Sequence, residues 1–353
     1  MKNKLVIAGH ICHDLPEPGK LGGASSFAAA AAGMQINGDL DITVVTRAPE
    51  GHPRMDDLHD LSDQYGFYVV NLANREVGYS GRITAFDNVY DKEGNRTQKQ
   101  PDAASGYTAE DARIIGGLLE DADNSALLVG SVSRNEVSTE FLQTIGNVRA
   151  KNSTKVVLLP QGLVRRVHSD TKSVTHDSEA LPWKNDDGLL RHATDLVVLS
   201  EEDLHGMPTG YEGFLAQTCN SMIVTRGKHG GTIYKDGQRI DQPAFQLTNQ
   251  EIVEGNWTGS GDTVSTIMLL RHLEGKSLPH AFAEAQLYTA AKISSGLYGA
   301  KDGLASLPNA EQFQQFLKDR SDRVQQFVED VYKSTKVELK FEAEGQLPYQ
   351  TRK

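Results

Sequence analysis

The feature that most constrains the fold is a series of short, almost uninterrupted runs of Val, Leu and Ile. They lie at 4–9, 41–46, 67–72, 126–131, 155–160, 195–200 and 221–227. Such continuous apolar content is typical of strands that are buried on both faces. Segments of helical periodicity separate most of them, at 24–34, 109–120, 136–150, 263–274, 279–295 and 309–332, and the predicted helix N-caps are Thr108 (with Asp111) and Asn309. This alternation predicts an α/β fold with a parallel central sheet.

Two segments depart from the alternation. Residues 78–100 alternate polar and apolar side chains and contain the turn sequence DKEGN, which predicts a β-hairpin with one solvated face. With residues 11–21 this hairpin could form a small sheet beside the main domain. Residues 165–187 are polar with little periodicity, so we expect an inserted loop there, and residues 333–353 are expected to form a charged tail.

Charge and cysteine content exclude several classes of protein. The net charge of −11 argues against a general binder of nucleic acid or of anionic membranes. The two cysteines, Cys12 and Cys219, are too few for a disulfide framework and favour a reducing compartment. The first apolar run is too short for a signal peptide, and no apolar stretch approaches the ~18 residues that a membrane span needs. We therefore expect a cytoplasmic protein with no nucleic-acid or membrane partner.

A glycine-rich turn followed by an acid carries the strongest chemical signal. Gly259, Ser260 and Gly261 precede Asp262 and a segment with helical apolar spacing. A turn of this kind at a helix start exposes backbone N–H groups at the positive end of the helix dipole, which suits an anion. An acid at its rim can take a proton from a hydroxyl while the N–H groups hold the charge of a transferring phosphoryl group. The alternative is a structural turn with Asp262 as an ordinary N-cap, and a motif this short does not decide between them.

Several motifs together resemble one known family. The segment NWTGSGD, 256–262, resembles the C-terminal signature Asp-x-Thr-Gly-Ala-Gly-Asp of the PfkB, or ribokinase-like, carbohydrate kinases, with Asn256 and Ser260 as departures. Further segments follow in the order of that family: GHICHDLP, LGGASSFAAAAAG, VTRGKHGGTIYKDG and ASLPNAEQF. The resemblance spans roughly residues 4–320, and ordered motifs are more specific together than singly. Within the family, ITAFDNVY and PQGLVR add a similarity to myo-inositol kinases.

The resemblance implies a fold, an activity and a catalytic group. It implies a ribokinase-like, Rossmann-type three-layer α/β/α sandwich over residues 1–332, with a small β-sheet lid formed by 11–21 and 78–100. The implied activity is ATP- and Mg²⁺-dependent phosphorylation of a hydroxyl of a sugar, an inositol-like polyol or a nucleoside. Asp262 would be the general base, and Gly259, Ser260 and Gly261 would form the anion hole. A non-catalytic sugar or nucleotide sensor with the same fold is the alternative.

The resemblance also implies substrate-binding residues. Asp14 matches the family's acid for substrate hydroxyls, and one carboxylate can accept from two adjacent hydroxyls of a polyol. The alternative for Asp14 is a solvated loop acid. Arg165 follows a strand at the edge where ligands bind in such sheets, so it could bind phosphate or equally pin the next loop. The implied set comprises Asp14, Gly22, Gly23, Ser26, Asn88, Gln98 and Arg165.

The residues that would bind the phosphoryl donor match the motifs of the family less closely. Thr225, Gly227, Lys228 and Gly230 correspond to the family's nucleotide motif, although a tight hairpin needs glycines in any case. Where the family often has Asn-x-x-Glu near magnesium and phosphate, this chain has Ser200 and Asp203, with Glu202 adjacent. We expect Ser200 on the nucleotide side, and Glu202 and Asp203 as candidate metal-binding oxygens. Exposed lid strands also suggest a homodimer through the lid.

Overall fold

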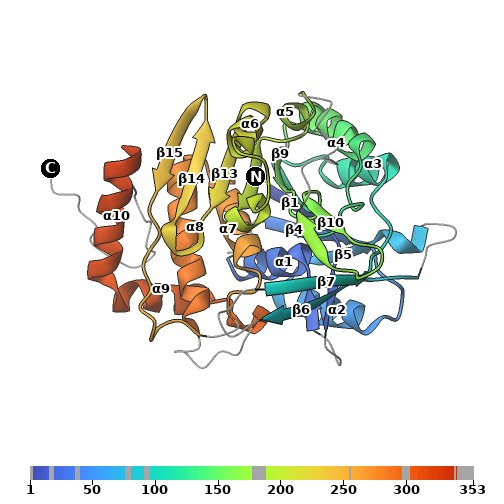
Figure 1. The fold of residues 1–353 in the computed structure, drawn as a ribbon, viewed down its shortest axis with the longest axis horizontal. Coiled ribbons are helices and arrows are strands. Elements are labelled where there is room, and N and C mark those ends of the chain that lie inside the picture. The colour runs from blue at the N-terminus through green and yellow to red at the C-terminus, as the bar shows by residue number, and fades with distance from the viewer. Residues whose placement is uncertain are drawn as a thin grey trace.

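The apolar runs form one nine-stranded sheet with the order β15-β14-β13-β12-β9-β8-β1-β4-β5 (Figure 1). The computed structural model describes residues 3–15, 20–35, 40–75, 81–90, 96–176, 188–253, 256–295, 303–337 and 339. The strands are β1 (Asn3–Ala8), β4 (Leu40–Thr46), β5 (Tyr68–Asn71), β8 (Asn124–Gly130), β9 (Lys155–Leu159), β12 (Leu196–Ser200), β13 (Ser221–Thr225), β14 (Gly231–Lys235) and β15 (Gln238–Gln242). From β5 to β13 the neighbouring strands are parallel, and β14 and β15 are antiparallel additions. The predicted parallel sheet is confirmed.

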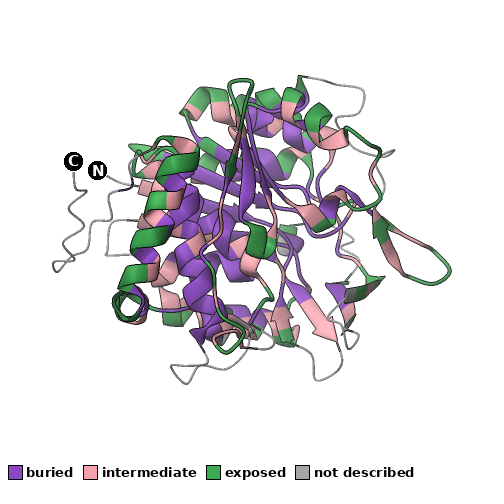
Figure 2. Cartoon of the chain, turned by 60° about the vertical axis from the view of Figure 1, so that its left-hand side comes forward, coloured by how far each residue is buried: buried purple, intermediate pink, exposed green. Residues whose placement is uncertain are grey.

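Helices cover both faces of the sheet, as a three-layer sandwich requires. One apolar cluster joins one face to α1 (Ala24–Met34), α2 (Pro53–Tyr65), α7 (Ser260–Leu273) and α8 (Leu278–Ile293). A second cluster joins the other face to α3 (Ala109–Leu118), α4 (Thr139–Asn152), α5 (Leu189–Ala193) and α6 (Tyr211–Thr218). Figure 2 shows the buried residues gathered along the strands and on the inner sides of the helices. The predicted caps Thr108 and Asn309 both form capping boxes.

The C-terminal region differs from the prediction of one helix over 309–332. It contains two helices, α9 (Ala310–Asp319) and α10 (Ser321–Thr335), separated at Arg320, whose backbone leaves the helical region at φ −124°. Both pack with α8 around Phe245 in a third apolar cluster. The expected tail is therefore helical over its first residues, and the rest of it, apart from 336, 337 and 339, lies outside the described residues. None of the helices described in the structure is both long and apolar enough to cross a membrane.

A separate small sheet has the order β3-β2-β6-β7. It is formed by β2 (Cys12–Leu15), β3 (Lys20–Gly22), β6 (Thr84–Tyr90) and β7 (Arg96–Asp102), and the predicted turn at 91–95 lies outside the described residues. In Figure 1, β6 and β7 lie below the main sheet, next to the labels of α1 and α2. We call these four strands the lid sheet.

The segment 165–187 is not simply a loop, and that prediction was wrong for its first half. Its residues form an antiparallel pair, β10 (Arg165–Val167) and β11 (Val174–His176), while 177–187 lie outside the described residues. Ser173 forms a β-bridge with Lys99 of β7, and the Gln100 amide donates to the Lys172 carbonyl at 2.9 Å. The pair therefore continues the lid sheet. Strands of three residues are too short to show a period in sequence.

Candidate active site

The topology favours a ligand site at the carboxyl edge of the sheet. The chain runs from β1 outward to β4 and β5, and returns to β8 on the other side of β1. Where the strand order reverses in this way, the loops after neighbouring strands separate and a ligand can bind between them. The N-terminal turn of α7 lies in this region, because Gly259 lies against Phe27 near the start of α1, and Gly23, the N-cap of α1, lies against the His10 carbonyl just after β1.

Gly259 occupies a position that only glycine fits well. Its backbone is left-handed, with φ 73° and ψ 9°, and a Cβ there would overlap the Phe27 ring of α1. Its carbonyl accepts from the Thr263 amide at 2.9 Å and from Thr263 Oγ1 at 2.8 Å. Gly259 is therefore the N-cap of α7. The alternative in which Asp262 caps the helix does not hold, because Asp262 lies in the first turn.

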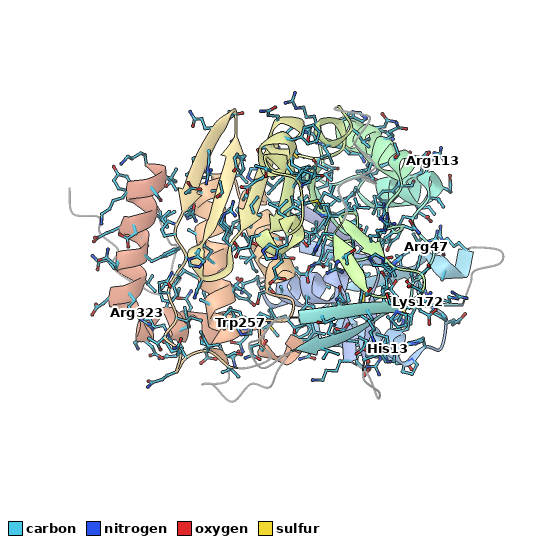
Figure 3. All side chains as sticks on the ribbon, in the orientation of Figure 1. His13, Arg47, Arg113, Lys172, Trp257 and Arg323 are labelled. Atoms are coloured by element: carbon cyan, nitrogen blue, oxygen red, sulfur yellow. The ribbon has the colours of Figure 1, made fainter. Side chains whose placement is uncertain are left out.

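The amides that follow Gly259 do not all have the same role. The Ser260 amide donates to the Trp257 carbonyl at 3.0 Å, so it closes the turn. Gly261 is exposed, open space surrounds it, and within the described part of the chain its amide has no backbone acceptor. Figure 3 labels Trp257, which is half exposed at the start of this turn. Of the predicted anion-hole amides, the one at Ser260 is thus already used.

Two candidate acids, Asp14 and Asp262, lie within electrostatic range of one buried thiol, that of Cys12. Burial raises the pKa of Cys12 well above its ordinary value, and the carboxylates of Asp14, Glu136 and Asp262 raise it further. The Arg165 guanidinium acts on the same thiol in the opposite direction. Asp14, Arg165 and Asp262 come from β2, β10 and α7, so the fold brings these distant parts of the sequence within electrostatic range of the Cys12 thiol.

The lid sheet presents a row of polar groups on the face that carries Asp14. Asp14 pairs with Phe86 in the parallel β2–β6 register, so both side chains lie on the same face. Asn88 is two residues beyond Phe86 and follows it on that face. It pairs with Gln98 of β7, whose Nε2 donates to Asn88 Oδ1 at 2.7 Å. Asp14, Asn88 and Gln98 thus share one surface, as substrate-binding residues would.

Gly22, Gly23 and Ser26 have structural reasons to be there. A Cβ at Gly22 would overlap Asp14 Oδ2, so this glycine leaves room for the carboxylate. Gly23 has φ 93° and is the N-cap of α1. Ser26 is fully buried and its Oγ donates to the Gly22 carbonyl at 2.9 Å. Ser26 therefore stabilises the glycine turn rather than lining an open surface.

Arg165 links the lid sheet to the main domain. Its side chain is 3% exposed, its Nη1 donates to the Val132 carbonyl at 3.0 Å, and its guanidinium lies 5.5 Å from the centre of the Phe86 ring. These contacts favour the role of pinning the segment that follows β9 over that of an open phosphate ligand.

Residues expected to bind the phosphoryl donor lie together at the ends of two neighbouring strands. Ser200 of β12 and Thr225 of β13 are paired in register at the carboxyl edge. Asp203 is buried, and its Oδ2 accepts from the Ser200 amide and from Ser200 Oγ, both at 2.9 Å, in a capping box. Glu202 is exposed beside it. No three metal-binding side chains converge in the portion of the chain that is described.

In the turn after β13 some residues are needed for packing, and others are exposed and accessible to a ligand. A Cβ at Gly230, which has φ 90°, would overlap the Gln242 carbonyl, so this glycine is needed for packing. Gly227, with φ 51°, and Lys228 are exposed. Arg226 points elsewhere, because its Nη2 lies 2.5 Å from Glu212 Oε1 in an ion pair. Gly227 and Lys228 are the members of this motif that a phosphate could approach.

Two buried charged residues near the site were missed in the sequence. Glu136 accepts hydrogen bonds from the amides of His10, Val132 and Ser133 at 2.6, 2.8 and 3.0 Å, and so joins the loops after β1 and β8. Lys292 of α8 is fully buried, and burial lowers its pKa to about 8, although Asp262 opposes this shift. A lysine within the apolar helical segment 279–295 was a signal in the sequence for the second of these.

Comparison with known proteins gives partial relatives in sequence. No model of a known protein family matches the chain. The bifunctional protein HldE of Pseudomonas putida strain F1 is 34% identical over 91 residues, which cover 26% of this chain and 17% of that protein. The HldE protein of Pseudomonas fluorescens strain SBW25 is 31% identical over 110 residues, which cover 31% of this chain and 21% of that protein. The match thus spans about a fifth of these relatives.

Solved structures match over nearly the whole chain. A variant of a pyrophosphate-dependent myo-inositol-1 kinase superposes with a TM-score of 0.64 at 17% identity, covering 90% of this chain and 99% of that one. Ribokinase from Thermotoga maritima gives 0.60 at 14% identity, with 89% and 99% covered. Burkholderia thailandensis nucleoside kinase gives 0.59 at 19% identity, with 90% and 98% covered. The predicted resemblance, including that to inositol kinases, is confirmed at the level of the fold, and the chain has the fold of the ribokinase family.

Proposed function

We propose that residues 1–332 form a kinase that transfers a phosphoryl group from ATP to a hydroxyl of a sugar, an inositol-like polyol or a nucleoside in the cytoplasm. The observation that carries this proposal is that two acids, Asp14 and Asp262, each lie beside a glycine turn, at Gly22 and at Gly259. One acid lies on the lid sheet and the other on the first turn of a helix at the carboxyl edge. That arrangement suits an acceptor held by Asp14 and deprotonated by Asp262.

Each proposed residue has a part in the reaction. Asp14, Asn88 and Gln98 would bind acceptor hydroxyls, which leaves the reacting oxygen facing Asp262. Asp262 would take the proton as that oxygen bonds to phosphorus and the bond to the leaving phosphate breaks. The amides of the turn at Gly259 and Gly261 would hold the charge of the transferred group. Closure of the lid sheet would exclude water, which otherwise would accept the phosphate.

The donor site would lie at the ends of β12 and β13. Thr225, Gly227 and Lys228 would approach its phosphates, with Ser200 beside them. A carboxylate for a hydrated Mg²⁺, which would neutralise donor phosphates, fits better at Glu202 than at Asp203, because Ser200 already occupies the Asp203 carboxylate. Since similar structures include pyrophosphate-dependent kinases, both ATP and pyrophosphate should be tried as donors.

A panel of alcohols with either donor and Mg²⁺ tests the proposal. We expect turnover of at least one polyol, sugar or nucleoside, and Asp262→Asn should lower kcat at least ~10²-fold, because a general base supplies that much. Asp56→Asn is the matched control, since Asp56 is an exposed acid in the first turn of α2. Wild-type kcat in Asp262→Asn would contradict the proposed base.

A non-catalytic sensor is the second candidate. The engagement of Asp203 by Ser200 favours it, because it removes one expected metal-binding carboxylate. A sensor would bind a polyol without turnover, and Asp262→Asn would leave its affinity unchanged. Calorimetric titration with myo-inositol, in the absence and presence of donor, separates the two candidates.

A homodimer through the lid is also proposed, with a restriction on its geometry. The β7 edge of the lid sheet is bridged to Ser173 of the same chain, so a partner would have to pair at the β3 edge. Sedimentation velocity over a range of concentrations would show whether the dimer exists.

A further inference from the structure

A lysine lies buried directly beneath the glycine turn. Lys292, in the last turn of α8, has no exposed surface. Its Nζ donates to the Asn256 carbonyl at 2.5 Å and to the Thr258 carbonyl at 2.8 Å, and it lies 5.8 Å from the centre of the Phe27 ring. Removing an ammonium from water is costly, so it persists in a fold only where such partners compensate.

The contact between Asn256 and Lys292 runs in both directions. Asn256 is also fully buried, and its Nδ2 donates to Ser295 Oγ at 3.2 Å and, more weakly, to the Lys292 carbonyl at 3.4 Å. The Val253 amide donates to the Ile293 carbonyl at 3.2 Å. The segment that enters the glycine turn is therefore clamped to the end of α8.

These contacts determine where the peptide groups of the turn point. A trans peptide is planar, and its N–H points opposite to its C=O. Because the Thr258 carbonyl faces the ammonium, the N–H of Gly259 points away from it. The same ammonium lies in electrostatic range of Asp262, which is in the first turn of α7, the helix that Gly259 caps. One cation thus faces the carbonyl side of the turn and acts on the acid that follows it.

We propose that Lys292 is a positioning residue for phosphoryl transfer: through the carbonyls of Asn256 and Thr258 it fixes the peptide planes on either side of Trp257 and Thr258, so that the turn presents the Gly259 amide to the transferred group, and it adds positive charge beneath that amide. The inference rests on the proposed function. In this role the Lys292 ammonium is a fixed positive charge beneath the anion hole, held by the carbonyls of Asn256 and Thr258.

The first test compares two lysine substitutions. Lys292→Met keeps most of the length of the side chain and removes its charge. We expect kcat to fall about 10- to 100-fold, as misplacement of a reacting group does, while KM for the acceptor changes less than about threefold. Lys151→Met is the control, because Lys151 is exposed on α4 and pairs only with Glu120 among its described contacts. Wild-type kcat in a folded Lys292→Met protein overturns the inference.

Rescue with small amines separates positioning from simple loss of packing. In Lys292→Ala we expect methyl-, ethyl- or propylammonium to restore kcat at least about threefold at constant ionic strength. Tetramethylammonium should not restore it, because it has no N–H to donate to the two carbonyls. Equal restoration by tetramethylammonium, or none by any amine, overturns the inference.

The pH dependence of kcat in the wild-type protein tests the inference even if both variants fail to fold. Burial lowers the pKa of Lys292 to about 8, and Asp262 of α7 is the charged neighbour that opposes this shift. The kcat should therefore fall reversibly as pH rises above about 8, with unchanged circular dichroism. A kcat that stays level up to pH 10 contradicts the inference.

The two proposals fail in different ways. If wild type turns over an alcohol, Asp262→Asn does not, and Lys292→Met equals wild type, only the role of Lys292 is wrong. If wild type turns over nothing with either donor, the kinase proposal is wrong, and binding of inorganic pyrophosphate then decides on Lys292. Lys292→Met should weaken that binding at least about threefold, and equal affinity, or no binding by wild type, overturns the inference.

Discussion

The Asp14 carboxylate lies against the α-carbon of Gly22, where a Cβ would overlap Oδ2. Gly22→Ala should therefore displace the proposed acceptor-binding carboxylate. We expect KM for the acceptor to rise at least about tenfold, since an ionised acid contributes more per hydrogen bond than a neutral group does. Steady-state kinetics with the best alcohol of the panel measures this. Gly117→Ala on α3, where open space surrounds the α-carbon, should leave KM unchanged and stabilise the protein by up to about 1 kcal/mol.

The hydrogen bond between Gln98 and Asn88 predicts coupled effects on substrate binding. Asn88→Ala leaves Gln98 Nε2 without its 2.7 Å partner, so the remaining amide loses its orientation. We expect each single alanine substitution to raise the acceptor KM, and the double substitution to cost less than the sum of the two. Val89→Ala is the control, because Val89 points to the other face of the lid sheet and is 56% exposed. Strict additivity would show that the pair does not act as a unit.

Substitutions of the neighbouring acids Glu202 and Asp203 should have different effects, one on stability and the other on the dependence of activity on Mg²⁺. Asp203→Ala removes the capping box with Ser200 and should lower the free energy of unfolding by about 1 kcal/mol. Glu202→Gln should leave the melting temperature unchanged and raise the Mg²⁺ concentration that gives half-maximal activity. Thermal unfolding and a Mg²⁺ titration of both variants check this. The reverse pattern would assign the metal to Asp203.

Much of the fold could be predicted because its signals are local. Continuous apolar runs predicted β1, β4, β5, β8, β9, β12 and β13, and the side chains of Thr108 and Asn309 predicted two helix starts. Helix α2 was missed because its residues are mostly polar and only Met55 and Leu58 are buried. Packing at the surface of the sheet, rather than its own periodicity, stabilises such a helix.

The site was predicted in outline, and its details depend on contacts that sequence does not contain. The order of motifs indicated Asp14 and Asp262, yet nothing local indicated that Ser26 would donate to the Gly22 carbonyl. The pattern Ser-x-x-Asp at 200–203 is also that of a capping box, and this competing use prevailed for Asp203. The role of Lys292 depends on a contact with a residue 36 positions away.

The buried ammonium of Lys292 also predicts how stability depends on pH. Burial lowers its pKa from 10.5 to about 8, so between these values the unfolded chain keeps a proton that the folded protein has lost. Because the unfolded state then binds more protons, the free energy of unfolding of wild type should rise with pH relative to that of Lys292→Met. The change over this window should be about 3 kcal/mol, from the ~1.4 kcal/mol that corresponds to each pH unit. Urea unfolding of both proteins between pH 7 and 10.5 measures it, and subtraction removes the titration of the buried tyrosines and cysteines. A difference between the two proteins that does not change with pH would mean that Lys292 keeps an ordinary pKa in the folded protein.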